Sequence, residues 1–402
     1  MSAAADVTVI GGGIVGLSTA MAILTRHPDV RLSVVEKEPA IARHQTGHNS
    51  GVIHSGAYYR PGSLKARLTV AGARRMIDFC RQHAIAHDVC GKVIVATHAE
   101  ELPRLDELHR RSVANGLAEV GLIGPERLRE IEPHAAGLRA LHVPATGIVD
   151  YAAVARGYAD VIVRAGGEIL TDTRVLGIVR DGSGWQLETT RGALASHALV
   201  NCAGLHSDRV ARMAGLNPGV RIVPFRGDYY RLKAARADLV RALIYPVPDP
   251  AFPFLGVHFT RMISGAVEAG PNAVLSLDRE GYRRTAFAPR DAWEALAYPG
   301  FLRLAARHWR TGFGELYRAF NKRAFARALA RLLPEIRPDD LEPAGAGVRA
   351  QALNASGALL DDFIIEERPR AIHVLNAPSP AATASLMIGE AIAERASTCF
   401  GL

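Results

Sequence analysis

The chain is poor in cysteine and contains no long hydrophobic run. Its 402 residues include four cysteines, Cys80, Cys90, Cys202 and Cys399, without C-x-x-C spacing or any other metal-ligand pattern. We therefore expect reduced, mostly structural thiols and no metal site. No apolar run reaches the roughly 18 residues that a membrane-spanning helix needs. The N-terminus lacks a basic stretch followed by a cleavage site, so a cytoplasmic protein is expected.

The composition is typical of a soluble globular protein, with 49% hydrophobic and 22% charged residues. A chain of this length ordinarily holds two or three domains. The formal net charge of +8 has two interpretations. It could be a solvated basic surface, or it could attract an anionic partner such as nucleic acid, lipid or a polycarboxylate substrate.

The most informative stretch is residues 6–36. An apolar run ends in the glycine cluster Gly11-Gly-Gly13-Ile14-Val15-Gly16, a helical run follows, and a second apolar run ends at Glu36. This strand–turn–helix–strand context is the one that a dinucleotide-binding glycine motif requires. In such a motif the glycines permit a tight turn, close approach of a pyrophosphate and close helix packing, while the acid accepts hydrogen bonds from ribose. Glu36 would repel the extra phosphate of NADP, but the motif does not distinguish NAD from FAD.

Several later segments support an α/β fold. Residues 44–64 read as an ordered loop, 64–83 as a helix, 88–97 as a short strand and 98–133 as charged helices. Asp150 is expected to cap a helix over 152–164, strands follow over 167–200 with a hairpin at 181–184, and the strand 198–204 leads through Ala203-Gly204 into a helix over 207–215. Residues 220–273 are rich in β-strand patterns, and residues 288–333 are helical and basic. A strand over 371–376, a turn at 378–380 and a helix over 381–395 close the chain.

These segments resemble the D-amino-acid-oxidase superfamily of flavoproteins and, within it, the L-2-hydroxyglutarate oxidases and dehydrogenases. The resemblance is carried by the glycine motif, His48-Asn-Ser-Gly-Val-Ile-His54, Pro224-Phe-Arg-Gly, Phe254-Leu-Gly-Val-His258-Phe-Thr-Arg261, Gly347-Val-Arg349-Ala-Gln351 and Asn376-Ala-Pro-Ser-Pro-Ala-Ala-Thr383. It covers nearly the whole chain. It implies FAD as cofactor and oxidation of L-2-hydroxyglutarate to 2-oxoglutarate, with hydride transfer from Cα to the flavin N5.

The resemblance also implies the fold. We expect an α/β Rossmann-like FAD-binding domain built from discontinuous segments, 1–85, 145–219 and 340–402. The remaining segments, 86–144 and 220–339, are expected to form an α+β substrate domain with a mixed sheet. The predicted FAD-binding residues are Gly11, Gly13, Ile14, Val15, Gly16, Glu36, Lys37, Thr46, Gly47, His48, Asn49, Ser50, Gly51, Val175, Ala203, Gly204, Pro380, Ala381, Ala382 and Thr383. For Val175, a core position is an equal alternative.

Two histidines are candidates for the base that removes the hydroxyl proton of the substrate, since histidine titrates near neutral pH. We favour His258 slightly over His54, which could instead hydrogen-bond the flavin or carry a covalent link to it. A dicarboxylate substrate calls for two cationic anchors, and arginine binds a carboxylate through two hydrogen bonds. Arg261 and Arg349 are the first candidates. Tyr59, Arg60, Arg226 and Tyr245 are further candidate substrate contacts.

Eight basic residues between Arg303 and Arg331 stand against one acid, Glu315. This run is either a solvated helix face or a surface that contacts anionic lipid at the inner membrane. The electron acceptor is left open among oxygen, a quinone and an electron-transfer protein. Alternatives are another flavin-linked hydroxyacid or glycerol-phosphate dehydrogenase, or a flavoprotein that modifies RNA. Nucleic acid is not the expected partner, because the arginines lack interleaved aromatics for base stacking, although Phe320 and Phe325 leave that alternative open.

Overall fold

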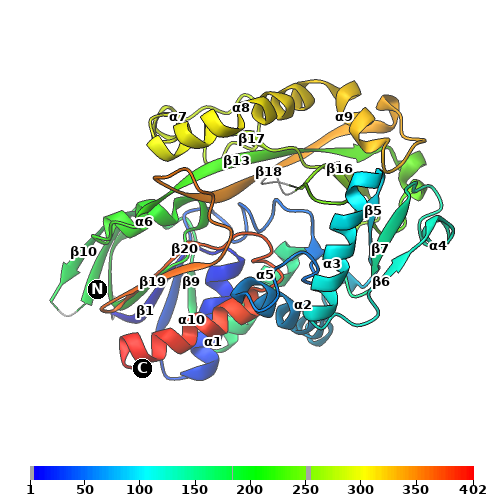
Figure 1. The fold of residues 1–402 in the computed structure, drawn as a ribbon. Helices are drawn as coiled ribbons and strands as arrows, with labels where there is room; N and C mark the ends of the chain where they lie inside the picture. The colour runs from blue at the N-terminus through cyan, green and yellow to red at the C-terminus, as the bar shows by residue number, and fades with distance from the viewer. Residues whose placement is uncertain (1–3, 183, 250–254) are drawn as a thin grey trace.

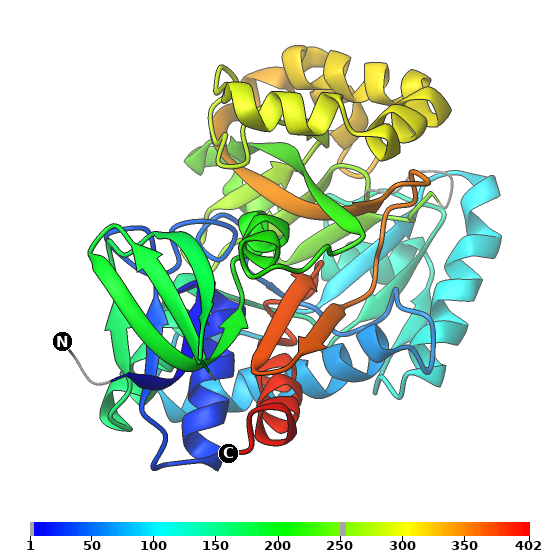
Figure 2. The same cartoon turned by 90° about the vertical axis from the view of Figure 1, so that its left-hand side faces the viewer.

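The computed structural model describes residues 4–182, 184–249 and 255–402. Its architecture consists of two large sheets (Figure 1) and a smaller three-stranded sheet. The two termini lie at the end of the molecule that holds the first sheet, and helices α7 and α8 lie at the opposite end (Figure 2).

The first sheet has a parallel centre. Its strand order is β10-β11-β12-β1-β2-β9, and β20 pairs with β12 and β19. Its strands are β1 (Ala5–Ile10), β2 (Leu32–Val35), β9 (Glu168–Leu170), β10 (Val175–Asp181), β11 (Gly184–Thr189), β12 (Gly192–Asn201), β19 (Ile364–Arg368) and β20 (Ala371–Asn376). Because β12 pairs in parallel with β1, the two glycine turns that follow these strands lie side by side.

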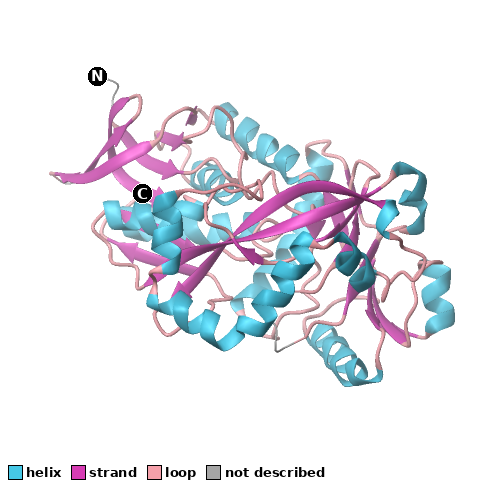
Figure 3. Ribbon diagram, turned by 90° about the horizontal axis from the view of Figure 1, so that it is seen from above, coloured by secondary structure: helices cyan, strands magenta, loops and turns pink. Residues whose placement is uncertain are grey.

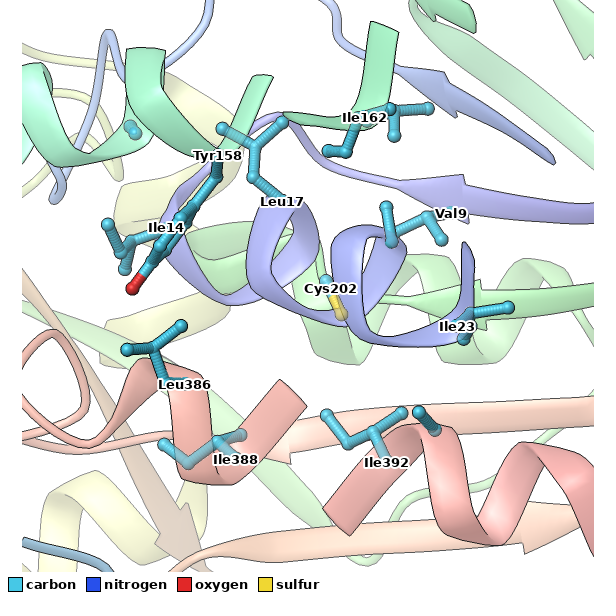
Figure 4. Close-up of a cluster of buried hydrophobic side chains, with 14 of the residues drawn as sticks. Val9, Ile14, Leu17, Ile23, Tyr158, Ile162, Cys202, Leu386, Ile388 and Ile392 are labelled. Atoms are coloured by element: carbon cyan, nitrogen blue, oxygen red, sulfur yellow. The ribbon is translucent and has the colours of Figure 1, made fainter. Parts of the chain in front are cut away.

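Helices pack on this sheet through a large apolar core. They are α1 (Ile14–Arg26), α2 (Leu64–Gln82), α5 (Tyr151–Arg164), α6 (Ser207–Met213) and α10 (Ser385–Phe400). Figure 4 shows Leu17 of α1 beside Tyr158 of α5, with Leu386, Ile388 and Ile392 of α10 on the other side of α1. A Cβ at Gly389 would lie 2.6 Å from the backbone of Ser18, so α1 and α10 approach closely only with a glycine there.

The second sheet has the order β17-β13-β16-β15-β14-β5-β7-β6, with β18 on β13. Its strands are β5 (Lys92–Ala96), β6 (Gly121–Ile123), β7 (Arg139–Val143), β13 (Val220–Leu232), β14 (Leu243–Pro246), β15 (His258–Arg261), β16 (Val267–Gly270), β17 (Val274–Leu275) and β18 (Leu341–Asn354). The small sheet consists of β3 (Val52–Ile53), β4 (His87–Asp88) and β8 (Gly147–Val149). Figure 3 shows β13 and β18 as the longest ribbons of the structure.

The remaining helices belong to the second half of the molecule. They are α3 (Leu102–Ala114), α4 (Pro125–Ile131), α7 (Pro289–Leu296), α8 (Pro299–Phe320) and α9 (Lys322–Leu329). Short 3-10 turns occur at η1 (Ala99–Glu101), η2 (Gly204–His206), η3 (Ala234–Leu239) and η4 (Pro338–Asp340). Helices α7 and α8 cover the outer side of β13, β17 and β18 (Figure 1).

Most predicted elements are present, with three differences. A strand, β6, interrupts the helical stretch predicted over 98–133, because it completes the edge beside β7. The closing helix begins at Ser385 rather than 381, since residues 378–384 form consecutive turns. Strand β18 joins β13 in the second sheet, although it falls in the 340–402 segment assigned to the FAD domain. The domain limits themselves stay a prediction. The predicted hairpin at 181–184 joins β10 to β11. Ser183 of this hairpin and Phe254 of the quoted motif lie outside the described residues.

Candidate active site

One cavity of about 440 Å³ lies where the two sheets face each other. The first sheet and its loops contribute the α1 N-terminus, the loop 45–54 and the segment 374–383. The second sheet contributes residues of β13, β14, β15 and β18. Predicted residues that line this cavity are Gly13, Ile14, Val15, Thr46, His48, Asn49, Ser50, His54, Gly204, Tyr245, His258, Arg349, Pro380, Ala381, Ala382 and Thr383.

In the glycine turn, the backbone packing of the protein accounts for glycine at two positions, and a third glycine indicates a ligand. Gly11 has φ +116°, and a Cβ there would lie 2.5 Å from the Cys202 carbonyl oxygen. A Cβ at Gly16 would lie 2.0 Å from the carbonyl oxygen of Gly11. At Gly13, by contrast, the nearest atom to a Cβ is Thr46 Oγ1 at 3.4 Å, an ordinary contact. Protein packing therefore does not require glycine at position 13, whereas close approach of a phosphate to the helix N-terminus does.

This difference gives the first prediction. Gly13→Val should leave the fold of the apoprotein intact but abolish FAD binding, because the added methyl groups would project into the phosphate position. The flavin absorbance of the purified variant measures FAD binding, and its circular dichroism spectrum checks that the fold is intact. Gly121→Val is the matched control, since a Cβ at Gly121 meets nothing within 4 Å and the position lies outside the cavity lining. A yellow, FAD-loaded Gly13→Val protein would contradict the assignment.

The loop after β2 is held by its own side chains. The Ile14 backbone N–H donates to Thr46 Oγ1 at 2.9 Å. The Asn49 amide donates to the Thr46 carbonyl at 2.6 Å, and its oxygen accepts from Gly51 N–H at 2.8 Å. These bonds fix the loop against the α1 N-terminus without a regular element, as the small polar residues predicted.

Glu36 is buried and oriented by backbone donors. Its carboxylate accepts from Gly12 N–H at 2.7 Å and from Glu38 N–H at 2.9 Å. Each carboxylate oxygen keeps a second lone pair for a ribose hydroxyl. Glu36 is outside the cavity lining, as is Lys37, whose ammonium lies 2.7 Å from Glu280 and 2.8 Å from His44.

Metal-ligand atoms do gather beside Lys37. Ligand atoms of Glu38, His44 and Glu280 lie within 4.8 Å of one another. The Lys37 ammonium pairs with both carboxylates and so supplies positive charge there. The expected absence of a metal site stays a prediction.

The other predicted FAD residues lie outside the lining. A Cβ at Gly47 would lie 2.5 Å from the Ala42 carbonyl, and one at Gly51 2.6 Å from that of Val149, so both are needed by the fold itself. Ala203 and Val175 pack on the apolar cluster around Ile10 and Val35. Their proposed contacts with FAD stay predictions.

Thr383 links the segment 374–383 to the loop 45–54, which contains His48 and His54. Its hydroxyl accepts from the His54 backbone N–H at 3.1 Å and lies 2.8 Å from the Tyr151 hydroxyl and 3.2 Å from the Val52 carbonyl. The side chain is fully buried. Thr383 thus anchors the segment 380–383 to the wall of the cavity.

His258 begins β15 and faces the cavity. Its Nδ1 lies 2.8 Å from the Gly256 carbonyl oxygen, which can only accept, so Nδ1 carries the proton and Nε2 keeps a free lone pair. The ring packs on Tyr245 with centroids 3.9 Å apart. Burial, with the nearby Arg349 and Lys92 charges, lowers the pKa of His258 to about 3. The imidazole is therefore neutral at pH 7, the form that a base requires.

His54 lies on the same cavity but has a different setting. Its Nδ1 is buried and has no hydrogen-bond partner among the residues that the structure describes. Burial, with Lys92, His258 and Lys65 nearby, lowers its pKa to about 3. Buried polar atoms are normally hydrogen-bonded. A cofactor bound in this cavity would supply the hydrogen-bond partner for His54 Nδ1.

These shifts predict acid lability. An unfolded chain protonates His258 near its ordinary pKa of 6.5, whereas the folded protein does so only near 3. Within that window the unfolded state binds the extra proton, so the free energy of unfolding falls as the pH falls. The expected slope is about 1.4 kcal/mol per pH unit for each such histidine. His258→Gln should show a shallower decline of the thermal unfolding midpoint with acidification than wild type. Parallel declines would contradict the assignment.

The predicted arginines divide into two groups. Arg349, on β18, lines the cavity, and burial lowers the pKa of its guanidinium. Arg261 pairs with Asp88 and lies outside the lining. Arg226 is buried and pairs with Asp228 at 3.1 Å.

Two candidate substrate contacts lie on the loop before α2. Arg60 is exposed, and the Tyr59 ring lies 5.0 Å from the Lys65 ammonium. Both residues are outside the cavity lining, whereas Tyr245 is part of it. Their contacts with substrate stay predictions.

Sequence reasoning missed several residues that line the cavity. Gln45 accepts from Ala350 N–H at 3.0 Å and so connects the loop 45–54 to β18. Tyr229 of β13 faces the same space, where burial raises its pKa to about 12. Lys65 of α2 lines it as well. Residues 227 and 229 share one face of β13, so the alternation of the strand was a usable signal for Tyr229.

Comparison with known proteins decides the family. A sequence profile of the FAD dependent oxidoreductase family (DAO) matches residues 6–395. L-2-Hydroxyglutarate dehydrogenases from Indibacter alkaliphilus, Escherichia coli K12 and Homo sapiens are 50%, 46% and 44% identical. These matches cover 97%, 98% and 99% of this chain and 98%, 93% and 89% of the relatives. The chain belongs to the L-2-hydroxyglutarate dehydrogenase family.

Solved structures agree on the fold of this family member. An FAD-bound L-alpha-glycerophosphate oxidase from Mycoplasma pneumoniae has a TM-score of 0.77 at 22% identity, covering 97% of this chain and 94% of that one. Glycine oxidase from Geobacillus kaustophilus has a TM-score of 0.72 at 20% identity, with coverages of 97% and 95%. The fold class is therefore confirmed, and the chain is an FAD-dependent oxidoreductase. The space beside Gly13 and the buried His54 Nδ1, which has no hydrogen-bond partner among the described residues, fit FAD as the cofactor.

Proposed function

We propose that this protein oxidises L-2-hydroxyglutarate to 2-oxoglutarate. The observation that carries the proposal is a cavity in which a neutral histidine and an arginine, His258 and Arg349, lie beside the cofactor-binding segments. The relatives that carry the name L-2-hydroxyglutarate dehydrogenase match almost the whole chain. FAD, when bound, supplies the acceptor for the electron pair of the substrate Cα–H bond.

His258 is proposed as the base. Its ring is held by the Gly256 carbonyl and by Tyr245, and Nε2 is the ring nitrogen that can accept the hydroxyl proton. An anionic substrate beside the ring favours its protonated form and raises its pKa during the reaction. His54, whose backbone is held by Thr383, is proposed to contact the cofactor.

Arg349 is proposed to bind one carboxylate. Its side chain lies on β18 and lines the cavity. For the second carboxylate, the predicted Arg261 must first release Asp88. Lys65 already lines the cavity and needs no such rearrangement, so we propose it as the competing anchor.

Anaerobic addition of L-2-hydroxyglutarate tests the proposal directly. The flavin absorbance should bleach in one turnover, whereas D-2-hydroxyglutarate should leave it unchanged because fixing both carboxylates turns its Cα hydrogen away. Glycerol 3-phosphate is the control for the alternative dehydrogenase. Bleaching by glycerol 3-phosphate and not by L-2-hydroxyglutarate would overturn the proposal. Oxygen, a quinone and an electron-transfer protein stay open as the electron acceptor.

The RNA alternative loses one of its two supports. Phe325 is fully buried and packs on Tyr230 with ring centroids 4.8 Å apart, so it is not available to stack on a base. Phe320 is exposed, and the Arg284 guanidinium lies 5.9 Å from its ring centroid.

A further inference from the structure

The segment between β17 and α7 belongs to the second half of the molecule, but its side chains reach across to the first sheet. A carboxylate oxygen of Glu280 lies 2.7 Å from the Lys37 ammonium and 2.7 Å from His206 Nε2. His44 Nε2 lies 3.5 Å from the same oxygen. Burial raises the pKa of the Glu280 carboxyl, but hydrogen bonds from His206 and Lys37 outweigh this effect and hold that pKa far below its ordinary value. The ionised carboxylate thus meets three basic side chains from another part of the fold.

These three basic side chains all stand beside predicted cofactor contacts. Lys37 directly follows the acid that is expected to bind ribose. His44 precedes Thr46 by two residues, and His206 follows Gly204 by two residues. Thr46 and Gly204 both line the cavity. Glu280 therefore contacts the loops that follow β2 and β12 at the points where they approach the cofactor site.

Tyr282 provides a second contact with the loop after β2. Its ring stacks on His48, with centroids 4.0 Å apart and planes inclined by 21°. Its hydroxyl lies 3.1 Å from His44 Nδ1. His48 lines the cavity, whereas Tyr282 is outside the lining. Tyr282 therefore supports a wall of the cavity without being part of that wall.

Arg279 fixes the segment beside Glu280. Its side chain is 1% exposed, and its guanidinium donates to Asp208 Oδ1 at 2.5 Å and to the Leu205 carbonyl at 2.6 Å. Asp208 belongs to α6 and is fully buried. Charge-assisted hydrogen bonds of this kind are strong and directional. They hold the segment against the first sheet, where Glu280 and Tyr282 meet their partners.

We propose that residues 279–282, which we call the clasp, hold the cofactor-binding loops closed around FAD, with Glu280 and Tyr282 as positioning residues for this cofactor. The clasp belongs to the second half of the molecule, whereas the loops that it holds belong to the first sheet. Retention of FAD would then depend on contact between the two halves and not only on the glycine turn. The proposal rests on the FAD dependence of the chain, which its family establishes, and not on the identity of the substrate.

Release of FAD from the loaded full-length protein tests the clasp. Glu280→Gln keeps the shape of the side chain but removes its charge. Release should become faster on the order of tenfold, because Lys37, His44 and His206 lose their shared charged acceptor. The rise of flavin fluorescence after dilution measures the release rate.

Glu294→Gln is the matched control for this charge. Glu294 of α7 also joins the two halves, since it lies 2.7 Å from Arg209 of α6, and its side chain is 21% exposed against 28% for Glu280. Arg209 is outside the cavity lining. Arg279, which Glu294 also contacts, keeps its bonds to Asp208. This variant should release FAD at the wild-type rate.

A second pair of variants tests the stacked ring. Tyr282→Leu removes the stack on His48 and should also speed FAD release on the order of tenfold. Tyr282→Phe keeps the ring and loses only the hydroxyl contact with His44, so its release rate should stay close to that of wild type.

The melting temperature separates retention of the cofactor from ordinary destabilisation. FAD stabilises the folded protein by an amount that falls as its affinity falls. In Glu280→Gln and Tyr282→Leu, the difference between the melting temperatures of the FAD-loaded protein and the apoprotein should therefore narrow. Loss of packing alone would lower both temperatures together and leave the difference unchanged, as is expected for Glu294→Gln.

Three results would overturn the proposal. Glu280→Gln and Tyr282→Leu could both release FAD at the wild-type rate. Glu280→Gln could bind FAD more tightly, which would mean that the freed Lys37 attracts the phosphates instead. FAD could stay attached to the denatured wild-type protein, in which case a covalent link and not the clasp retains it. None of these measurements uses L-2-hydroxyglutarate, so their outcome is independent of the proposed function.

Discussion

Replacing Arg349 with alanine is expected to lower kcat/KM for L-2-hydroxyglutarate on the order of a thousandfold or more, because a desolvated carboxylate would lose its charged partner. Arg349→Lys keeps the charge but loses the planar pair of donors, and should also weaken activity markedly. Steady-state kinetics with a soluble dye acceptor measure both effects. Arg231→Lys, an exposed position on β13, should leave the kinetics unchanged.

The same argument predicts substrate discrimination. L-2-Hydroxybutyrate lacks the second carboxylate and would leave one cationic anchor buried without its partner. The wild-type enzyme should therefore prefer L-2-hydroxyglutarate by on the order of a thousandfold in kcat/KM. Lys65→Met and Arg261→Met identify the second anchor, since only the correct one should erase this preference. Comparable turnover of the two substrates by wild type would disprove the two-anchor arrangement.

The second large effect is expected at His258. His258→Gln should lower kcat by roughly a hundred- to ten-thousandfold, the usual contribution of a positioned base, while FAD stays bound and its spectrum is normal. Rapid-mixing measurement of the flavin bleaching rate isolates this step from reoxidation. The rate of the variant should rise with pH, as the substrate hydroxyl loses its proton to solvent instead.

His54→Gln serves as the comparison for the base assignment. Its main effect should be weaker FAD binding, because His54 lines the cavity and is proposed to contact the cofactor. A normal bleaching rate in His258→Gln together with a collapsed one in His54→Gln would exchange the two roles.

Local chemistry explains why much of the cofactor region could be predicted. The turn at Gly11–Gly16, the acid at Glu36 and the polar loop around Asn49 each depend on bonds between residues close in the chain or on adjacent strands. Asp150 likewise caps α5 through its own neighbour, Ala152. Such interactions leave a recognisable spacing in the sequence.

The arginines show where that reasoning failed to discriminate. Arg261, Arg226 and Arg349 all looked suitable as anchors. Arg261 and Arg226 pair with Asp88 and Asp228, whereas Arg349 lines the cavity. Asp88 is 173 residues away from Arg261 in the chain. No local pattern reports that distant pairing, so the sequence could not rank the three.

By itself, the sequence determined the α/β class, the dinucleotide turn and the family resemblance, since periodicity, glycine spacing and motif order are written along the chain. Only the tertiary structure decided that β18 joins the second sheet, that Arg349 reaches the cavity while Arg261 does not, and that the aromatics of α7 and α8 face outward. The physical reason is that pairing partners and burial depend on which distant segments pack together. A helix with apolar residues on two sides can bury only the side that its neighbours cover.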